Sequence, residues 1–371
     1  MGDVFSNIWG QPKVREFLRT ASATGGLSHA YLLCGPAGSG KTAAAHVLAA
    51  ARLCSRGGCG ECETCRRVLL RRHPDVHVFS PEGAQAYLVG QVRDLMADVS
   101  LAPIQADAKV YVIERADLLN AASANAFLKT LEEPPEGVML VLMARTVDAV
   151  LPTIVSRCQV VPFRTVPERE AIGLVCQNAG VSEERARMAL AACDGSAERA
   201  VEFARSNKSM AHAREVFSMM ARLRESDDWD IVKASRSLVF ASEAPLDDVR
   251  REQEEYLEAN ADFLSRAAVK QIKERDERAV KAARARARVS DLALLKSWLR
   301  DVMATCAGAR GSVVNTEFAT AIEREAAHTD EARVASAIRK VDEASALLAR
   351  NVSPQTCIDT LLFDIREIVY D

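Results

Sequence analysis

The fold of this 371-residue chain is decided by the stretch Gly35-Pro36-Ala37-Gly38-Ser39-Gly40-Lys41-Thr42. The apolar run Ala30–Leu33 that precedes it is typical of a buried strand, and the pattern over Thr42–Ala51 is helical. A glycine-rich loop between a strand and a helix is the context that a P-loop requires. The sequence therefore predicts a phosphate-binding loop near the start of an α/β domain.

The chemistry of this loop follows from its residue types. Small glycines allow consecutive backbone N–H groups to point at phosphates, and the start of the following helix adds partial positive charge. Lys41 is expected to reach the outer phosphates and Thr42 to supply a ligand for Mg²⁺. We therefore expect residues 35–42 to bind ATP or ADP with Mg²⁺. The alternative, a glycine-rich turn that binds no nucleotide, is disfavoured by the flanking strand and helix.

A second strand, Val110–Ile113, ends at Glu114 and Arg115. Glu114 can supply a carboxylate near Mg²⁺, but Arg115 occupies the position where ATP-hydrolysing motors commonly carry a glutamate that polarises water. A guanidinium stays protonated and cannot accept that proton. Asp117, three residues beyond Glu114, is the alternative base. The sequence thus predicts a site that binds nucleotide and hydrolyses it weakly or not at all.

The rest of the chain divides by its patterns. Three further strand-like runs lie before residue 165, whereas only helical patterns follow Pro167. We expect an α/β P-loop module with a parallel sheet over 1–165, an all-α lid over 166–208 and an all-α oligomerisation domain over 209–371. The further strands are expected at Val76–Phe79, Val138–Met143 and Val160–Phe163, and helices beyond them at Ser182–Ala192 and Ala197–Ala204.

Charge and hydropathy limit the possible partners. The chain has 48 Lys and Arg against 51 Asp and Glu, and a net charge of −3 argues against a grip on DNA by the whole surface. An acidic stretch, 247–262, precedes a basic one, Arg266–Arg288, which either contacts phosphate or forms a solvated helix face. No run of about 18 apolar residues occurs, so we expect a cytoplasmic protein without a membrane segment.

Four of the ten cysteines are clustered at 54–65: Cys54, Cys59, Cys62 and Cys65. Four thiolates at this spacing suit tetrahedral Zn²⁺ and leave no open position, so the metal would be structural. An iron–sulfur cluster and plain reduced cysteines are the competing interpretations. This four-cysteine knuckle is expected to fix the loop between the P-loop helix and a helix that starts near Arg66.

Together these motifs resemble those of bacterial clamp-loader AAA+ subunits. The resemblance rests on the P-loop, the four-cysteine knuckle after its helix, His73-Pro74-Asp75, the segment 125–135 with its Leu-Glu-Glu-Pro-Pro, and the segment 151–158 with its Ser-Arg-Cys. It is strong to residue 165 and weaker after it. It implies a ring of five subunits with gamma/tau and delta subunits, acting on the sliding clamp and primer-template DNA in DNA replication.

Within that family the Ser-Arg-Cys segment carries an arginine finger, and this role passes by resemblance to Arg157. The finger would act in trans on the ATP of a neighbouring subunit, where a fixed guanidinium stabilises charge on phosphoryl oxygens. The alternative is an arginine that binds a surface carboxylate.

Departures from the motor pattern favour one type of subunit. The motors carry an Asp-Glu pair at the second strand, a polar sensor on a later strand and an arginine in the lid helix. This chain has Glu114-Arg115, Arg145 beside Thr146, and Glu198-Arg199 at the corresponding positions. These features favour a delta-prime-type subunit with weak or absent ATPase activity of its own. The alternative is an active gamma/tau-type motor, and polymerase activity would belong to the holoenzyme.

Overall fold

The computed structural model describes residues 3–81, 86–243, 250–251, 253–255, 258, 266–350 and 352–370. The chain forms two compact units. The first comprises Met1–Pro167 and Leu257–Ala279, and the second comprises Glu168–Tyr256 and Val280–Asp371. The division of the helical part into a lid and a further domain at residue 208 stays a prediction.

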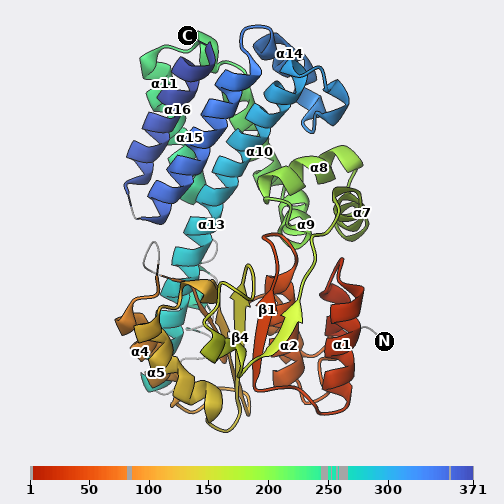
Figure 1. Ribbon diagram of the computed structural model, residues 1–371, viewed down its shortest axis with the longest axis vertical. Helices are drawn as coiled ribbons and strands as arrows, with labels where there is room; N and C mark the ends of the chain where they lie inside the picture. Colours follow the sequence, from red (N-terminus) through yellow and green to blue (C-terminus); the bar gives the residue numbers. More distant parts are fainter. Residues whose placement is uncertain are drawn as a thin grey trace. The chain divides into compact units, whose positions relative to one another are not determined.

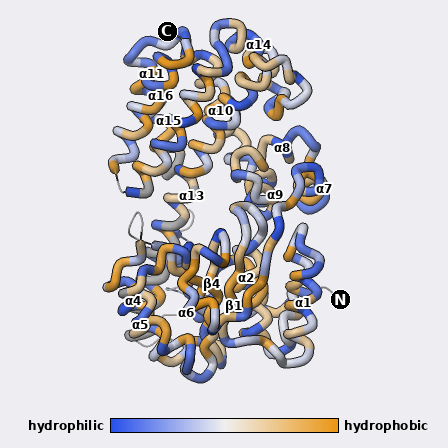
Figure 2. Tube along the Cα trace, in the orientation of Figure 1, coloured by the Kyte–Doolittle hydropathy of each residue, from blue (hydrophilic) through white to orange (hydrophobic). Residues whose placement is uncertain are grey.

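The first unit is built on a five-stranded parallel sheet with the order β2-β3-β4-β1-β5 (Figure 1). Every residue of β1, β3 and β4 is buried, as expected for parallel strands covered on both faces. Figure 2 shows hydrophobic residues along β1 and β4. The strands are β1 (Ala30–Cys34), β2 (Val76–Phe79), β3 (Lys109–Ile113), β4 (Val138–Ala144) and β5 (Gln159–Pro162).

Helices cover both faces of this sheet. Alternate residues of each strand point to opposite faces, so Tyr31 and Leu33 of β1 pack with α2 whereas Leu32 packs in the cluster of α4 and α5. The elements around the sheet are the 3-10 helices Val4–Asn7 and Ala116–Leu118 and the helices α1 (Pro12–Ala23), α2 (Lys41–Leu53), α3 (Glu63–Leu69), α4 (Val89–Val99), α5 (Ala121–Glu132) and α6 (Pro152–Val155).

A fully buried carboxylate fixes the approach to β3. Asp75, just before β2, accepts hydrogen bonds from the backbone N–H groups of Ile104, Gln105 and Ala106 at 2.5, 2.8 and 2.8 Å. Such bonds compensate the cost of burying a charge. The His-Pro-Asp motif thereby holds the segment that leads into the strand of Glu114.

The second unit is entirely helical in its described residues. Helix α13 contributes residues to both units. The elements are α7 (Glu168–Ala179), α8 (Glu183–Ala192), α9 (Ala197–Arg205), α10 (Asn207–Met220), α11 (Asp228–Glu243), α13 (Arg266–Cys306), α14 (Ala319–Ala326), α15 (Glu331–Ala349) and α16 (Pro354–Tyr370), with 3-10 helices at Leu223–Glu225, Arg310–Ser312 and Thr316–Phe318.

Three aromatic rings mark the core of the second unit. Phe217 of α10, Trp298 of α13 and Phe318 lie with ring centroids 5.4–6.1 Å apart, which suits offset or edge-to-face packing. Met188 and Ala192 of α8 belong to the same buried cluster. The residues of the expected lid therefore share one hydrophobic core with the helices that follow them.

The predicted fold class is confirmed, with small differences at element ends. β5 is shifted by one residue, and α2 begins at Lys41 instead of Thr42. The acidic stretch 247–262 lies mostly outside the described residues. In the basic stretch, Ile272 and Asp276 are buried one helical turn apart, so its charges do not surround the helix evenly. No described helix has the length and apolar character needed to span a membrane.

Candidate nucleotide site and metal centre

The P-loop connects β1 to α2 at the carboxyl ends of the parallel strands. Gly38 and Gly40 have φ angles of 72° and 88°, a region that glycine adopts without a steric penalty. Gly40 is also the N-cap of α2, so the free N–H groups of the first helical turn face the loop. The backbone therefore has the form that an anion-binding loop needs.

Lys41 folds back over this loop. Its Nζ donates to the carbonyl oxygens of Gly35 and Pro36, both at 2.6 Å, and lies 3.3 Å from Ser39 Oγ. Burial lowers the pKa of Lys41, and the charge of Arg145 lowers it further. The ammonium thus lies within the loop, bound to neutral oxygens of its own chain.

Two features hold the loop against the segment that follows β5. A side chain at Gly35 would place a Cβ 2.6 Å from the carbonyl oxygen of Phe163, so only glycine fits without movement. The buried amide of Gln11 donates to Ser39 O at 3.0 Å and Arg164 O at 2.7 Å, and its oxygen accepts from the backbone N–H of Arg164. One side chain therefore joins the loop to the segment after β5.

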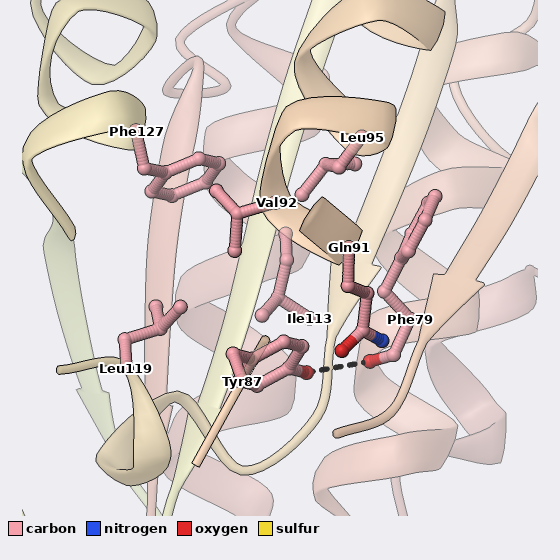
Figure 3. A pocket seen from close by; sticks show the side chains of 8 residues that line it. All are labelled: Phe79, Tyr87, Gln91, Val92, Leu95, Ile113, Leu119 and Phe127. Carbon is pink, nitrogen blue, oxygen red and sulfur yellow. Dashed lines mark hydrogen bonds between the residues drawn. The ribbon is translucent and has the colours of Figure 1, made fainter. Parts of the chain in front are cut away.

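Glu114 lies at the end of β3, where two hydroxyl groups donate hydrogen bonds to it. Ser80 Oγ donates to its carboxylate at 2.6 Å, and the hydroxyl of Tyr87 donates to its backbone carbonyl. Tyr87 also donates to Phe79 O at 2.9 Å, the contact drawn in Figure 3. The hydroxyl of Tyr87 thereby ties the end of β2 to the end of β3, which fixes the position of the Glu114 carboxylate.

The cavity in Figure 3 is lined in part by Tyr87 and is too small for a ligand of nucleotide size. It has a volume of about 10 Å³, close to that of one water probe. Its wall is mainly apolar and includes Phe79, Leu95, Ile113 and Phe127. We regard it as a packing defect beneath α4 and α5.

Arg115 forms an ion pair with the alternative base. Its Nη2 lies 3.0 Å from Asp117 Oδ2, and its Nε lies 3.2 Å from the same oxygen. The Arg115 backbone has a φ of 53°, which is unusual for a residue with a side chain. Asp117 is therefore engaged in an ion pair, and the position of the expected base carries a cation.

Arg145 begins the segment after β4, directly beside the P-loop. Cys34 pairs with Ala144 in the sheet, and the Gly35 N–H donates to Ala144 O at 3.2 Å. Arg145 is exposed, and the next residue is Thr146. Because β4 lies between β1 and β3, the backbone of residue 145 leaves the sheet between the phosphate loop and the end of β3.

The four clustered cysteines lie together after α2. The Sγ atom of Cys54 is 3.8 Å from that of Cys59 and 3.7 Å from that of Cys62, and all four sulfur atoms lie within 4.8 Å of one another. Positive φ angles at Gly57, Gly58 and Gly60 allow the tight turns between them. None of the four forms a disulfide.

This geometry fits Zn²⁺. Four sulfur atoms at the usual Zn–S distance of about 2.3 Å are separated by about 3.8 Å along each edge of the tetrahedron. Burial acts to raise the pKa of Cys54, but backbone N–H groups that point at its sulfur bring the value down to about 6. Cys62 caps α3, which begins at Glu63, three residues before the predicted start. The described group is a cluster of four cysteines beside Val4 and α1.

Arg157 follows α6 and contacts its own chain. Its Nε donates to Glu132 Oε1 at 2.7 Å, and its Nη1 donates to Thr153 O at 2.9 Å. About one third of its side chain is exposed. In the single chain the guanidinium thus binds a surface carboxylate, the alternative that the sequence left open, and a role in trans stays a prediction.

Sequence reasoning missed three residues of the candidate nucleotide site: Gln11, Ser80 and Tyr87. Gln11 follows Trp9-Gly10 far from the loop in sequence, and Tyr87 lies in a connecting segment before α4. A glutamine beside a helix start and a tyrosine before one leave no periodic pattern. Only the contacts across the sheet edge identify them.

The sheet order and the loop after β1 define an α/β module with a P-loop, and the second unit is helical in its described residues. Residues 10–167 match the family described as "DNA polymerase III, delta subunit". This confirms, for that part of the chain, the resemblance to bacterial clamp-loader subunits.

Curated relatives of two types match the chain. The "DNA polymerase III subunit delta'" of Bacillus subtilis is 36% identical over 208 residues, which is 55% of this chain and 62% of that protein. The delta' subunit of Pseudomonas aeruginosa is 45% identical over 35% of this chain and 42% of its own length. The "DNA polymerase III subunit gamma/tau" of Mycobacterium bovis is 34% identical over 48% of this chain and 32% of its own length. The chain thus spans less than two thirds of each relative.

Proposed function

We propose that this chain is a delta-prime-type subunit of a replicative clamp loader, which binds nucleotide at residues 35–42 and acts in trans through Arg157. In this role it completes a five-subunit ring with gamma/tau and delta subunits in the cytoplasm. The ring places the sliding clamp on primer-template DNA during replication. Zn²⁺ bound by the four clustered cysteines is structural, and any polymerase activity belongs to the holoenzyme.

The proposal rests above all on the Arg115–Asp117 ion pair beside an intact P-loop. A motor needs an acceptor for the proton of the attacking water. Here the relevant position is a guanidinium, and the nearby Asp117 is bound to it at 3.0 Å. Glu114 can hold Mg²⁺ when it is bound, and Lys41 and Thr42 can hold phosphate and metal. This chemistry favours nucleotide binding without efficient hydrolysis.

The test measures ATP binding and turnover by the purified full chain, and then turnover after mixing with the other loader subunits and primed DNA. We expect binding without turnover by the chain alone, and turnover once the loader is assembled. Brisk turnover by the chain alone would overturn the proposal.

The second candidate is an active motor of the gamma/tau type. It is favoured by the complete P-loop and by the 34% identity to the Mycobacterium bovis gamma/tau subunit. The two candidates differ at Arg115. In a motor that already hydrolyses ATP, Arg115→Glu changes turnover little, whereas in a delta-prime-type subunit this change supplies a missing carboxylate and raises turnover in the assembled loader.

A further inference from the structure

Two connections run from the four-cysteine knuckle to the phosphate loop. The first is α2, which begins at Lys41 in the loop and has Cys54 of the knuckle as its C-cap. A helix of 13 residues is about 20 Å long, so the two sites lie at opposite ends of α2. The second connection is the segment 3–11, which contacts the knuckle at one end and the loop at the other.

At the knuckle, the segment 3–11 is bound to a glycine turn. The Val4 N–H donates to Gly58 O at 3.0 Å. Ser22 Oγ of α1, the helix that follows the segment, donates to Gly57 O at 3.1 Å. A Cβ at Gly58 would lie 2.6 Å from Val4 Cγ2, so the turn and the segment are in close contact. The position of the segment therefore depends on the shape of the turn.

At the loop, the same segment ends in Gln11. Its buried amide donates to Ser39 O at 3.0 Å and to Arg164 O at 2.7 Å. Between the two ends, Val4 and Ile8 are buried in the cluster that contains the inner face of α2. Packed interiors have low compressibility and transmit strain. A shift at the knuckle is therefore transmitted to the amide that holds the loop.

The turn of the knuckle is fixed only when its four thiols bind one ion. None of the four cysteines forms a disulfide, so the sulfur atoms are not linked covalently to one another. A tetrahedral ion holds four sulfur atoms at set separations and thereby contributes to folding. Cys59 also lines a surface groove of about 540 Å³, so a chelator in solution can reach the cluster.

We propose that the segment 3–11 couples the four-cysteine knuckle to the phosphate loop, with Gln11 as the positioning residue. Zn²⁺ in the knuckle then tightens nucleotide binding, and bound nucleotide tightens the binding of Zn²⁺. The two effects are equal in free energy, because coupling between two binding sites is reciprocal. The proposal rests on the proposed function, since it assumes that residues 35–42 bind nucleotide and that the four cysteines bind Zn²⁺.

The test measures both directions of the coupling in the full chain. Calorimetry gives the Kd for ADP with Mg²⁺ before and after Zn²⁺ is removed with EDTA and the EDTA is dialysed away. We expect removal to raise this Kd by about fivefold, the effect of one net hydrogen bond. Competition with 4-(2-pyridylazo)resorcinol gives the Zn²⁺ affinity, which should rise by the same factor when ADP saturates the chain. Lys41→Ala, which weakens nucleotide binding, controls for Zn²⁺ bound by ADP itself.

Gln11→Met keeps the size of the side chain and removes its amide, so it separates positioning from general stabilisation of the fold. We expect this variant to bind ADP more weakly, with one Kd whether or not Zn²⁺ is present. Its Zn²⁺ affinity should be the same with and without saturating ADP. Ser22→Ala, which removes the bond to Gly57, should reduce the coupling. The control Ser100→Ala removes an exposed hydroxyl elsewhere in the first unit and should match the wild-type protein.

Circular dichroism of each sample, including the zinc-free chain, shows whether it is folded. If the wild-type chain binds ADP with the same Kd with and without Zn²⁺, the inference is wrong and the proposed function stands. Full coupling in Gln11→Met would also overturn the inference, and where that variant does not fold, full coupling in Ser22→Ala decides the same point. If the wild-type chain binds no nucleotide or no Zn²⁺, that part of the proposed function falls and the inference falls with it.

Discussion

Arg157 and Glu132 form an ion pair that joins two motifs of one surface, with Arg157 Nε 2.7 Å from Glu132 Oε1. The two side chains are 33% and 49% exposed. An exposed pair of this kind contributes about 0–1 kcal/mol. The pair therefore orients the guanidinium and contributes little to stability, so that in the proposed role Arg157 can exchange Glu132 for phosphate oxygens of a neighbouring subunit.

Arg157→Ala should leave nucleotide binding by this chain unchanged and lower the ATPase rate of the assembled loader by about tenfold or more, because arginine fingers stabilise the charge of the transition state. Glu132→Gln is the matched control, since it removes the partner and keeps the guanidinium. We expect that variant to retain the assembled rate and to lose less than about 1 kcal/mol of stability. An unchanged rate in Arg157→Ala would remove the finger assignment.

The purified chain should contain about one equivalent of zinc, because four thiolates fill one tetrahedral site. Cys59→Ser should lose most of that metal and unfold at a lower temperature. Cys176→Ser is the control, since Cys176 is a half-buried thiol outside the cluster. Elemental analysis and thermal unfolding provide the measurements. Iron in place of zinc, or equal metal content in the two variants, would contradict the prediction.

Gly35→Ala should destabilise the first unit and weaken nucleotide binding. The added Cβ would lie 2.6 Å from Phe163 O and 2.7 Å from Phe163 Cβ, so the backbone must shift, at a cost of about 1–3 kcal/mol. Gly90→Ala is the control, because no atom lies within 4 Å of its added Cβ in the first turn of α4. Denaturant unfolding should show a loss for the first variant and no loss for the second.

Stability should depend on pH through His212 and Asp291, whose Nε2 and Oδ1 atoms lie 2.6 Å apart in the second unit. Burial acts to lower the pKa of His212, but the hydrogen bond and charge of Asp291 raise it above its ordinary value of 6.5. The raised pKa means that the pair stabilises the folded state below pH 6.5 as long as Asp291, whose own pKa is raised above 3.8 by burial, stays ionised. This contribution is lost as the pH rises through the higher pKa of the folded state.

Asp291→Asn removes the charge and should lower the free energy of unfolding most at pH 6, by about 1–3 kcal/mol. The difference from the wild-type protein should shrink toward pH 9. Arg214→Gln is the control, because it removes a surface ion pair, that of Arg214 with Glu317, which contains no histidine. A difference that is the same at both pH values would show that His212 does not titrate against Asp291.

The parts of the fold that could be predicted are those determined by residues close together in the sequence. The apolar run Ala30–Leu33 and the glycines of the loop act on neighbouring residues, so the sequence alone indicates β1 and the phosphate loop. Glu114 and Arg115 were placed correctly at the end of β3 for the same reason. The sequence predicts a parallel sheet but not the order of its strands, because the pairing between β1 and β4 joins residues more than a hundred positions apart.

The contacts that could not be predicted are those between distant segments. The Gln11 amide meets residues 39 and 164, and the hydroxyl of Tyr87 meets residues 79 and 114. A single polar side chain leaves no periodic pattern in the sequence. The sequence therefore does not reveal whether the partner of that side chain is water or a buried carbonyl group. Glu132 as the partner of Arg157 belongs to the same class, since only the packing of α5 near α6 brings the two together.

The bridge made by Gln11 has a mechanical consequence. Its buried amide holds Ser39 and Arg164, so displacing either residue alone leaves a polar group without a partner, at a cost of about 1–3 kcal/mol. That cost is several times thermal energy. Residue 164 lies just before the point where the chain leaves the first unit. The tip of the loop and the segment after β5 are thus coupled through Gln11, so that a displacement of one of them strains the other.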